Sequence, residues 1–177
     1  LPGLWNDNER FVKSYLSEYP GYYFSGDGGF RDDDGYIYIT GRIDDVINVA
    51  GHRLSTSEME EIVAGHYAVA ECAVVGCHDE MKGQLPVGFV VLKHIFDQQE
   101  DQIRIELIAK VRDTIGAVAS FKTVYFIERL PKTRSGKILR KIIRAIADEQ
   151  TYQVPSTIED ITVLEELKWL LGLAQKN

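Results

Sequence analysis

The sequence predicts a mixed α/β fold, α+β in the broader sense, in which a β-meander precedes a small α/β domain. Between residues 22 and 50, aromatic and β-branched residues alternate with Gly- and Asp-rich turns, a pattern typical of consecutive short strands. From residue 70 to residue 148, strand patterns and helical patterns alternate, as in an α/β domain. Capping residues between these two regions indicate that the architecture changes near residue 55.

The meander is expected to consist of short strands separated by turns. Strand-forming residues occupy 22–24, 36–39 and 46–49, and Phe30 stands between two turns. The Asp-Asp-Asp-Gly run at 32–35 predicts the second turn, because Asp side chains hydrogen-bond nearby backbone and Gly tolerates positive φ.

Residues 41–45, Gly-Arg-Ile-Asp-Asp, form the boundary between the meander and the α/β domain. A glycine beside charged residues, with no apolar run across them, is compatible with a pivot between two domains. A solvated turn between two strands explains the same residues, and from the residues alone the turn is the favoured interpretation.

The α/β region is predicted to begin with a helix over about residues 57–66. Two overlapping Ser-x-x-Glu capping boxes, Ser55 to Glu58 and Ser57 to Glu60, precede its apolar positions. The apolar pattern then predicts strands near 70–75, 87–92 and 123–127, helices over 103–115 and 136–147, and a short amphipathic segment at 163–173.

The composition describes a globular chain with an uneven charge distribution. The 177 residues are 45% apolar and 27% charged, which suffices for one ordinary core or two small ones. The formal charge of −7 argues against general binding to nucleic acid or to an anionic membrane. Even so, seven of the twenty basic residues fall between Arg129 and Arg144, with no acidic residue among them. We refer to residues 129–144 as the basic strip.

The two cysteines, Cys72 and Cys77, flank a strand-like stretch, and only His78 adjoins them as a metal ligand. A zinc site needs about four ligands at paired spacing, so no metal site is expected and both thiols are expected to be buried and reduced. No apolar run approaches the ~18 residues of a membrane span, and nothing at the start resembles a signal peptide. Because residue 1 is leucine, we expect the chain to be part of a longer protein.

The run Leu-Pro-Lys-Thr-Arg-Ser-Gly-Lys at 130–137 is the most informative motif. It places Lys137 after Gly136 in a small polar loop, where an ammonium group can reach a phosphate held elsewhere. The eight residues alone fit a solvated lysine at a helix start about as well. A P-loop is excluded, because Ile138 follows the lysine in place of Ser or Thr and the earlier glycine is missing.

Three stretches in one order resemble a known family. They are YFSGD at 23–27, GYIYITGRIDDVINVAGHRL at 35–54 and LPKTRSGK at 130–137. The chain resembles, over essentially its whole length, the C-terminal end of the adenylate-forming superfamily of acyl-CoA synthetases, luciferases and nonribosomal peptide adenylation domains. Within that superfamily it is most similar to short-chain acyl-CoA synthetases of the acetyl- or propionyl-CoA synthetase branch.

The resemblance implies a domain organisation and a reaction. Residues 1–43 would end a β-rich N-terminal AMP-binding domain, 44–148 would form a mobile C-terminal lid domain, and 149–177 a tail. The partners would be a small carboxylate such as acetate or propionate, ATP and coenzyme A, with Mg²⁺ held by the N-terminal domain. Acyl-adenylate and pyrophosphate would form first, and the thiol of coenzyme A would then displace AMP. By itself the chain would be inactive; a regulatory or interaction fragment and a nucleic-acid-binding module through the basic strip are the alternatives.

The resemblance also implies roles for residues that bind the nucleotide. Lys137 matches the catalytic lysine of adenylation, which bridges the α-phosphate and the incoming carboxylate. Asp27 matches an aspartate that accepts hydrogen bonds from the ribose hydroxyls, although a turn-capping Asp is the simpler alternative. Arg42 matches a second ribose or phosphate contact, and Arg53 an arginine near the phosphate.

The second half-reaction and the domain movement would use three further residues. Gly51 lies where pantetheine must pass close to the backbone, and Arg112 matches a contact to the 3′-phosphate of coenzyme A. An exposed arginine with no ligand explains Arg112 about equally well. Asp44 matches the hinge about which the lid turns.

Regulation and location follow from the same resemblance. A lysine acetyltransferase and deacetylase acting on Lys137 would switch adenylation, because acetylation removes the charge. No nucleic acid or membrane partner is expected, and the location is expected to be intracellular, in the cytoplasm or the mitochondrial matrix. The sequence ends without a Ser-Lys-Leu peroxisomal signal.

Overall fold

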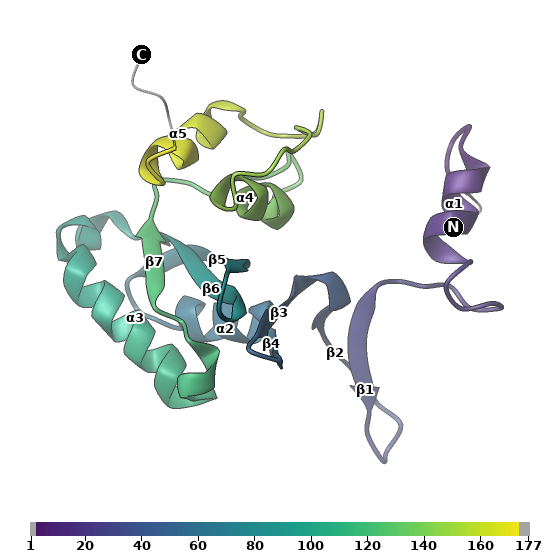
Figure 1. Cartoon of the computed structure of the whole chain (residues 1–177), viewed down its shortest axis with the longest axis horizontal. Helices are drawn as coiled ribbons and strands as arrows, with labels where there is room; N and C mark the ends of the chain where they lie inside the picture. Colours follow the sequence, from purple (N-terminus) through teal and green to yellow (C-terminus); the bar gives the residue numbers. More distant parts are fainter. Residues whose placement is uncertain (1–2, 174–177) are drawn as a thin grey trace. The chain divides into compact units, whose positions relative to one another are not determined.

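The structure is a computed structural model that describes residues 3–173, with the side chains of residues 96–98 left out. The chain divides into two compact units, Leu1–Asp44 and Asp45–Asn177. Each unit has its own sheet (Figure 1). The mixed α/β fold class expected from the sequence is confirmed.

The first unit contains one helix and one hairpin. Helix α1 (Asn8–Tyr15) starts after Asp7, whose carboxylate accepts a hydrogen bond from the N–H of Arg10 at 3.2 Å. Strands β1 (Asp27–Arg31) and β2 (Ile37–Arg42) pair antiparallel. The sequence analysis did not predict α1.

The β1–β2 hairpin carries large apolar side chains that remain exposed. A two-stranded sheet has no second layer in which to bury them, so it is marginally stable by itself. Exposed are Phe30, Tyr36, Ile37, Tyr38 and Ile39.

The second unit is built on a five-stranded sheet in which β4, β3, β6 and β5 are neighbours in that order. Strand β7 pairs parallel with residues 87–90 of β6. It lies along the same edge of β6 as β3, which pairs with β6 at Gly83. The strands are β3 (Val46–Val49), β4 (His52–Ser55), β5 (Val69–Asp79), β6 (Gly83–Leu92) and β7 (Thr123–Phe126).

The expected meander over residues 22–50 is therefore wrong in its continuity. A short 3₁₀ turn, Ile43–Asp45, separates β2 from β3, and β3 joins the sheet of the second unit. Residues 22–24 form no strand. Short strands cannot be assigned to one sheet or another from local pattern, because the partner strand is distant in sequence.

Helices cover both faces of the larger sheet (Figure 1). They are α2 (Thr56–Ala64), α3 (Glu100–Ile115), α4 (Arg140–Ala147) and α5 (Thr162–Leu170), with further 3₁₀ turns at His94–Gln99 and Ala117–Ala119. Helices α2, α3 and α4 correspond to the three helices expected from the sequence, and α5 lies within the 163–173 segment that was expected only to be amphipathic. The helix expected over 136–147 begins only at Arg140, so Lys137 lies in a loop.

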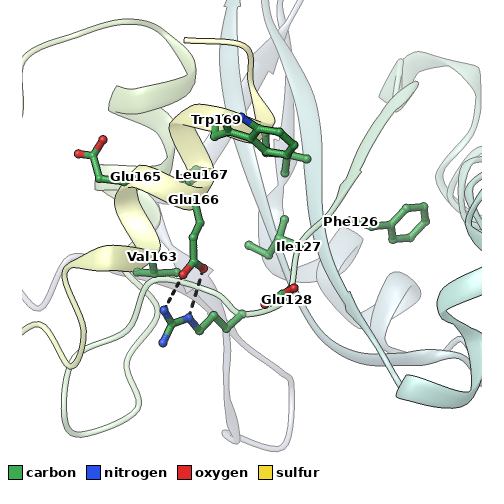
Figure 2. A pocket seen from close by; sticks show the side chains of 10 residues that line it. Phe126, Ile127, Glu128, Val163, Glu165, Glu166, Leu167 and Trp169 are labelled. Carbon is green, nitrogen blue, oxygen red and sulfur yellow. Dashed lines mark hydrogen bonds and ion pairs between the residues drawn. The ribbon is translucent and has the colours of Figure 1, made fainter. Parts of the chain in front are cut away.

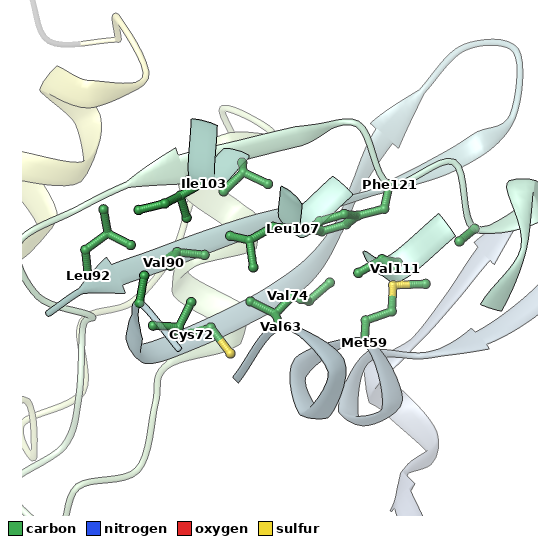
Figure 3. Close-up of a cluster of buried hydrophobic side chains, with 14 of the residues drawn as sticks. Met59, Val63, Cys72, Val74, Val90, Leu92, Ile103, Leu107, Val111 and Phe121 are labelled. Carbon is green, nitrogen blue, oxygen red and sulfur yellow. The ribbon is translucent and has the colours of Figure 1, made fainter. Parts of the chain in front are cut away.

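Two hydrophobic clusters result from the alternation of side chains along β5. Cys72 and Val74 face α2 and α3, where Met59 and Leu107 are fully buried, as Figure 3 shows. Ala73, Val75 and the neighbouring Phe89 face the opposite way, against α4 and α5. That second cluster contains Ile142, Ile143, Ile146, Val163, Leu164 and Leu167.

Residues after Asp148, expected as a tail, contribute one wall of the second cluster. Val163, Leu164 and Leu167 of α5 are each at most 3% exposed. Burial of a Val or Leu side chain stabilises a fold by roughly 1.5–3 kcal/mol. Helix α5 is thus part of the packed structure. Among the described helices, none has both the length and the apolar character needed to cross a membrane.

Candidate functional site

The Lys137 loop, residues 131–139, is a narrow hairpin. Lys132 and Ile138 form an antiparallel bridge, and the N–H of Thr133 donates to the carbonyl oxygen of Lys137 at 2.9 Å. The Thr133 hydroxyl accepts from the Lys137 N–H at 3.1 Å and contacts the Ser135 hydroxyl at 2.9 Å. Gly136 adopts φ +80°, a conformation that favours glycine. The motif therefore fixes the backbone of Lys137 while its side chain stays exposed.

Most cations of the basic strip are neutralised by acids from elsewhere in the fold. Arg129 binds Asp160 and Glu166, and Lys132 binds Glu71. The remaining pairs are Arg140 with Glu60, and Arg144 with Asp148 at 3.6 Å.

Lys137 differs from these neighbours. Within residues 3–173 the structure assigns its ammonium group no ion pair and no hydrogen bond. The apparent positive strip is thus largely an internal salt-bridge network, and Lys137 presents an available positive charge at its exposed end.

Arg140, at the start of α4, connects the end of the Lys137 loop to α2. Its guanidinium donates two hydrogen bonds to the Glu60 carboxylate, at 2.8 and 2.7 Å. The Glu60 hydrogen bonds raise the pKa of Arg140 above its ordinary value. Glu60 also accepts the N–H of Val74 at 2.8 Å. The capping box expected at Ser57 and Glu60 is therefore wrong, whereas Ser55 does cap α2 through the Glu58 N–H at 3.3 Å.

Asp27, Arg42 and Asp44 come together in the first unit. Asp27 and Arg42 are cross-strand partners in the β1–β2 hairpin, and the Arg42 guanidinium lies 3.3 Å from Asp27 and 3.1 Å from Asp44. The hydrogen bond to Asp44 is the main reason that the pKa of Arg42 is raised. The guanidinium also donates to the Ser25 carbonyl oxygen at 2.8 Å.

Gly26 makes this arrangement sterically possible. It adopts φ +77°, and a Cβ placed on it would lie 2.8 Å from the Arg42 guanidinium. Only glycine combines that backbone conformation with room for the arginine. The sequence analysis quoted Gly26 in a motif without giving it a role.

Gly51 occupies a two-residue turn between β3 and β4. Ala50 and Gly51 both have positive φ, 49° and 88°, which is the geometry of a type I′ hairpin turn. No atom lies within 4 Å of a Cβ placed on Gly51. Arg53 pairs with Asn48 across the hairpin and is exposed. The turn therefore presents bare backbone to the solvent.

Arg112, on the last turn of α3, lines a cavity of about 320 Å³. Three basic side chains border it, those of Arg112, Lys82 and Lys122. The Lys82 ammonium donates to the Ser120 hydroxyl at 2.9 Å, and the Lys82 carbonyl oxygen accepts the N–H of Ala50 at 2.8 Å. Lys82 therefore lines the cavity and also holds the turn next to Gly51 through its carbonyl oxygen.

The sequence analysis missed Lys82 and Lys122. No local signal distinguishes either lysine from other surface lysines, since the β-sheet and the end of α3 bring them together from distant segments. The hydrogen bond between Lys82 and the turn beside Gly51 was equally out of reach of local pattern.

The thiols have no visible chemical role. Cys72 and Cys77 are free, and burial raises their pKa values to about 11 and about 12. They lie on opposite faces of β5, in contact with different hydrophobic clusters. In the part of the chain that the structure describes, no group of three or more His, Cys, Asp or Glu side chains could hold a metal ion.

Comparison with known proteins identifies the domain. Residues 58–137 match the AMP-binding enzyme C-terminal domain. The chain is 52% identical, over 93% of its length, to an acetyl-coenzyme A synthetase of Phycomyces blakesleeanus, of which it covers 25%. It is 51% identical, over 93% of its length, to the mitochondrial acyl-CoA synthetase short-chain family member B of Dictyostelium discoideum, of which it covers 24%.

Among solved structures, an ATP-bound RpMatB-BxBclM chimera matches with a TM-score of 0.71 and 28% identity. The match covers 83% of the chain and 28% of the chimera. The likeness in structure therefore extends beyond the residues of the domain match.

The chain thus carries the C-terminal domain of the adenylate-forming enzymes. Within that class, it is homologous over nearly its whole length to acetyl-CoA synthetases and short-chain acyl-CoA synthetases. It spans about a quarter of the length of the curated relatives that it matches.

Proposed function

We propose that the chain acts as the C-terminal part of an AMP-forming acid-thiol ligase, which converts acetate or propionate, ATP and coenzyme A to acyl-CoA, AMP and pyrophosphate through an acyl-adenylate. The 51–52% identity to an acetyl-CoA synthetase and a short-chain acyl-CoA synthetase supports the class of reaction. The unpaired charge of Lys137 supports its part in that reaction.

Lys137 would stabilise the first half-reaction electrostatically. Negative charge accumulates where the carboxylate meets the α-phosphate, and a preorganised cation there is worth a few kcal/mol of barrier. Arg129, Lys132 and Arg140 of the basic strip already bind carboxylates, so their charge is not free for a nucleotide. The fixed backbone of the Lys137 loop would contribute the orientation of the long side chain.

Asp27, Arg42 and Arg53 would contact the nucleotide. Among residues 3–173, the Asp27 carboxylate accepts a single hydrogen bond, from Arg42, so it has capacity to accept the ribose hydroxyls. Arg42 would hold that carboxylate in place and Arg53 would approach the phosphate. Asp44, which binds Arg42, would be the hinge about which the lid turns between half-reactions.

Gly51 and Arg112 would serve the second half-reaction. The bare turn at Gly51 would let the pantetheine arm pass along the backbone, and the basic cavity beside it would take the phosphate end of coenzyme A. Lys82 and Lys122 increase the positive charge of that cavity, which favours a ligand role for Arg112 over a solvated arginine.

The N-terminal domain of such an enzyme would supply the Mg²⁺ ligands, the adenine pocket and the acyl pocket. We accordingly expect the isolated chain to form no acyl-adenylate. The location proposed is the cytoplasm or the mitochondrial matrix; several of the relatives are named as mitochondrial proteins. Acetylation of Lys137 by an acetyltransferase, reversed by a deacetylase, would stop adenylation, because it removes the positive charge of the lysine.

A nucleic-acid-binding role through the basic strip receives no support from the geometry. A phosphate backbone is bound by lysines and arginines whose charge is free to replace counterions. Here Arg129, Lys132, Arg140 and Arg144 bind acids of the chain itself.

Pyrophosphate release by the full-length protein, measured with acetate, propionate and butyrate, tests the proposal. We expect release that depends on the carboxylate, and its loss in Lys137→Ala but not in the nearby surface variant Lys141→Ala. The same protein acetylated at Lys137 should also lose it. Full activity of Lys137→Ala, or pyrophosphate exchange by the isolated 177-residue chain, would contradict the proposal.

A further inference from the structure

The Lys137 loop is held by a segment that follows it in sequence by some twenty residues. Thr133 forms an antiparallel bridge with Ile158, next to the bridge between Lys132 and Ile138. The N–H of Glu159 donates to the Lys132 carbonyl oxygen at 2.9 Å. The first strand of the loop thus lies between the strand that contains Lys137 and the 155–160 segment, and it is paired with both.

A second contact ties the tip of the loop to the same segment. The N–H of Arg134 donates to the Thr157 carbonyl oxygen at 2.9 Å, and its guanidinium donates to the Ser156 carbonyl oxygen at 3.3 Å. Both sides of the loop's first strand are therefore hydrogen-bonded, one side to the Lys137 strand and the other to the 155–160 segment. A backbone held in this way has little freedom at the position from which the Lys137 side chain departs.

The 155–160 segment is itself anchored at both of its ends. Ile158 N–H donates to the Pro155 carbonyl oxygen at 3.0 Å, which closes a turn, and the Ile158 side chain packs on the second hydrophobic cluster. Asp160 accepts the Arg129 guanidinium at 2.6 Å and accepts the Thr162 N–H at the start of α5 at 2.9 Å.

Arg129 completes the anchor through α5. Its guanidinium donates to the Glu166 carboxylate at 2.7 and 3.3 Å, the pair drawn with dashed lines in Figure 2. Hydrogen bonds to Glu166, and then to Asp160, raise the pKa of Arg129 well above its ordinary value. Arg129 lies just before the Lys137 loop. Its side chain thus joins the 155–160 segment to helix α5.

We infer that the 155–160 segment is a positioning element for Lys137 in acyl-adenylate formation. The match to the AMP-binding enzyme C-terminal domain ends at residue 137, so this element lies outside it. The inference rests on the proposed function, because it assigns to the segment an effect on the adenylation lysine. No residue of the segment needs to touch a substrate.

The orientation of the Lys137 side chain depends on how firmly its backbone is held. The Lys137 side chain has four rotatable bonds and no partner among the described residues, so its reach is determined by where its Cα is held. A displacement of about 1 Å in a reacting group can cost roughly 10²-fold in rate. Loss of the hydrogen bond between the Glu159 N–H and the Lys132 carbonyl oxygen would loosen the Lys137 backbone without removing a side chain from either hydrophobic cluster.

Glu159→Pro in the full-length protein tests the inference, with Glu159→Ala as its matched control. Proline at 159 removes the N–H that binds the Lys132 carbonyl oxygen, whereas alanine keeps it. The Glu159 side chain is exposed, so both variants lose the same surface group. Ile158→Ala, which removes packing but no backbone donor, is the second variant.

Two half-reactions are measured for each variant: pyrophosphate release with acetate or propionate, and thioester formation from preformed acyl-adenylate and coenzyme A. We expect Glu159→Pro to lower pyrophosphate release at least about tenfold relative to Glu159→Ala, with thioester formation within about twofold. Amide hydrogen exchange should be faster at Thr133, Gly136 and Lys137 and unchanged in β5 and α3.

Each remaining outcome counts against the inference. Equal loss of both half-reactions would indicate a structural role only, and unchanged pyrophosphate release with faster exchange would show that the loop tolerates displacement. If Glu159→Pro does not fold, Ile158→Ala decides by the same two rates. Lys137→Ala in the same assay separates the failures: if it keeps full pyrophosphate release, the proposed function is wrong, and if it loses release while Glu159→Pro does not, only the positioning role is wrong.

Discussion

The glycines of the turns at Gly51 and Gly136 have similar φ angles but very different surroundings. Their φ angles are +88° and +80°, both glycines are exposed, and no atom lies within 4 Å of a Cβ placed on either. Gly51 sits in a two-residue hairpin turn to which, among the residues that the structure describes, no side chain is hydrogen-bonded. Gly136 sits between Ser135 and Lys137, in a loop held by Thr133, Ser135 and the 155–160 segment.

Under the proposed function, the same backbone freedom would support two different purposes. At Gly136 the glycine lets the chain turn so that the next residue presents its ammonium group from a fixed position. At Gly51 the glycine itself would be the useful feature, because backbone without a side chain would admit a ligand closely. The Gly136 turn would then serve adenylation, and the Gly51 turn would serve thioester formation.

The comparison is tested most severely by Lys137→Ala. We expect acyl-adenylate formation to fall by about 10²–10³-fold, the loss typical of removing one preorganised charge donor from a transition state. Thioester formation from preformed acyl-adenylate should persist, because the proposed role of the lysine is confined to the first step. Single-turnover rates of both steps would measure this, and an equal loss in both would remove the distinction between the two turns.

Gly51→Ala and Gly136→Ala form a matched pair for the next largest effect. Both place a Cβ at similar positive φ in open space, so both should destabilise the protein alike, by about 1 kcal/mol. Gly51→Ala is expected to slow the thioester step about tenfold or more and to leave adenylation nearly unchanged.

Gly136→Ala is expected to show the reverse, because the strain falls on the residue before Lys137. Urea denaturation checks that the two stability losses agree, and the two half-reaction rates check the specificity. A variant pair that slowed the same step would refute the assignment of one turn to each step.

Arg112→Ala should have a smaller effect, confined to the Gly51 side. Two lysines remain in the cavity, so we expect KM for coenzyme A to rise about three- to tenfold, with kcat and the KM for ATP nearly unchanged. Lys110→Ala, on the same helix but outside the cavity, is the control. The rise in KM should be smaller at high salt. An equal rise in Arg112→Ala and Lys110→Ala would indicate that Arg112 is a solvated arginine without a ligand.

The smallest expected effect is a pH dependence of stability from the two thiols, one in each cluster. Burial raises the pKa values of Cys72 and Cys77 to about 11 and about 12, whereas an unfolded thiol has a pKa of about 8.5. The folded protein therefore holds these protons more tightly, so the contribution is complete below about pH 8 and is lost as pH rises through 11 and 12.

Between pH 8 and pH 10 we expect the unfolding free energy to fall by on the order of 1 kcal/mol for each thiol. Cys72→Ala and Cys77→Ala should each reduce that fall. Urea denaturation at the two pH values measures it, and a fall unaffected by both substitutions would assign the pH dependence to other groups.

Long and strongly periodic segments were predictable from the sequence. In α3, Ile103, Leu107 and Val111 are fully buried at the expected spacing, because a helix covering one face of a sheet repeats its apolar residues every three or four positions. Strand β5 was expected from its Val- and Ala-rich apolar run, although it extends to Asp79. Ser55 caps α2 through a purely local hydrogen bond, which sequence also reveals.

Short elements whose conformation is decided by pairing with another segment were not predictable. Ile138 and Leu139 fit the helical stripe of α4 but reach the cluster from an extended loop, since Lys132 pairs with Ile138. Strand β4 has only four residues, and its pairing with β3 decides its conformation.

The same distinction applies to the candidate site. Asp27, Arg42, Gly51 and Lys137 stand out in the sequence because their motifs are contiguous. Lys82 and Glu60 stand out only once the fold brings them to Ser120 and Arg140. Their roles as proposed remain predictions until the half-reactions are measured.

The Arg42 guanidinium, which rests against Gly26, is shared by Asp27 and Asp44. If Asp44 is the hinge of the lid, a rotation of its backbone would also displace the guanidinium that binds Asp27, the carboxylate proposed to bind the ribose. Rotation of the lid and binding of the ribose would then be coupled, because both would depend on the position of the Arg42 guanidinium.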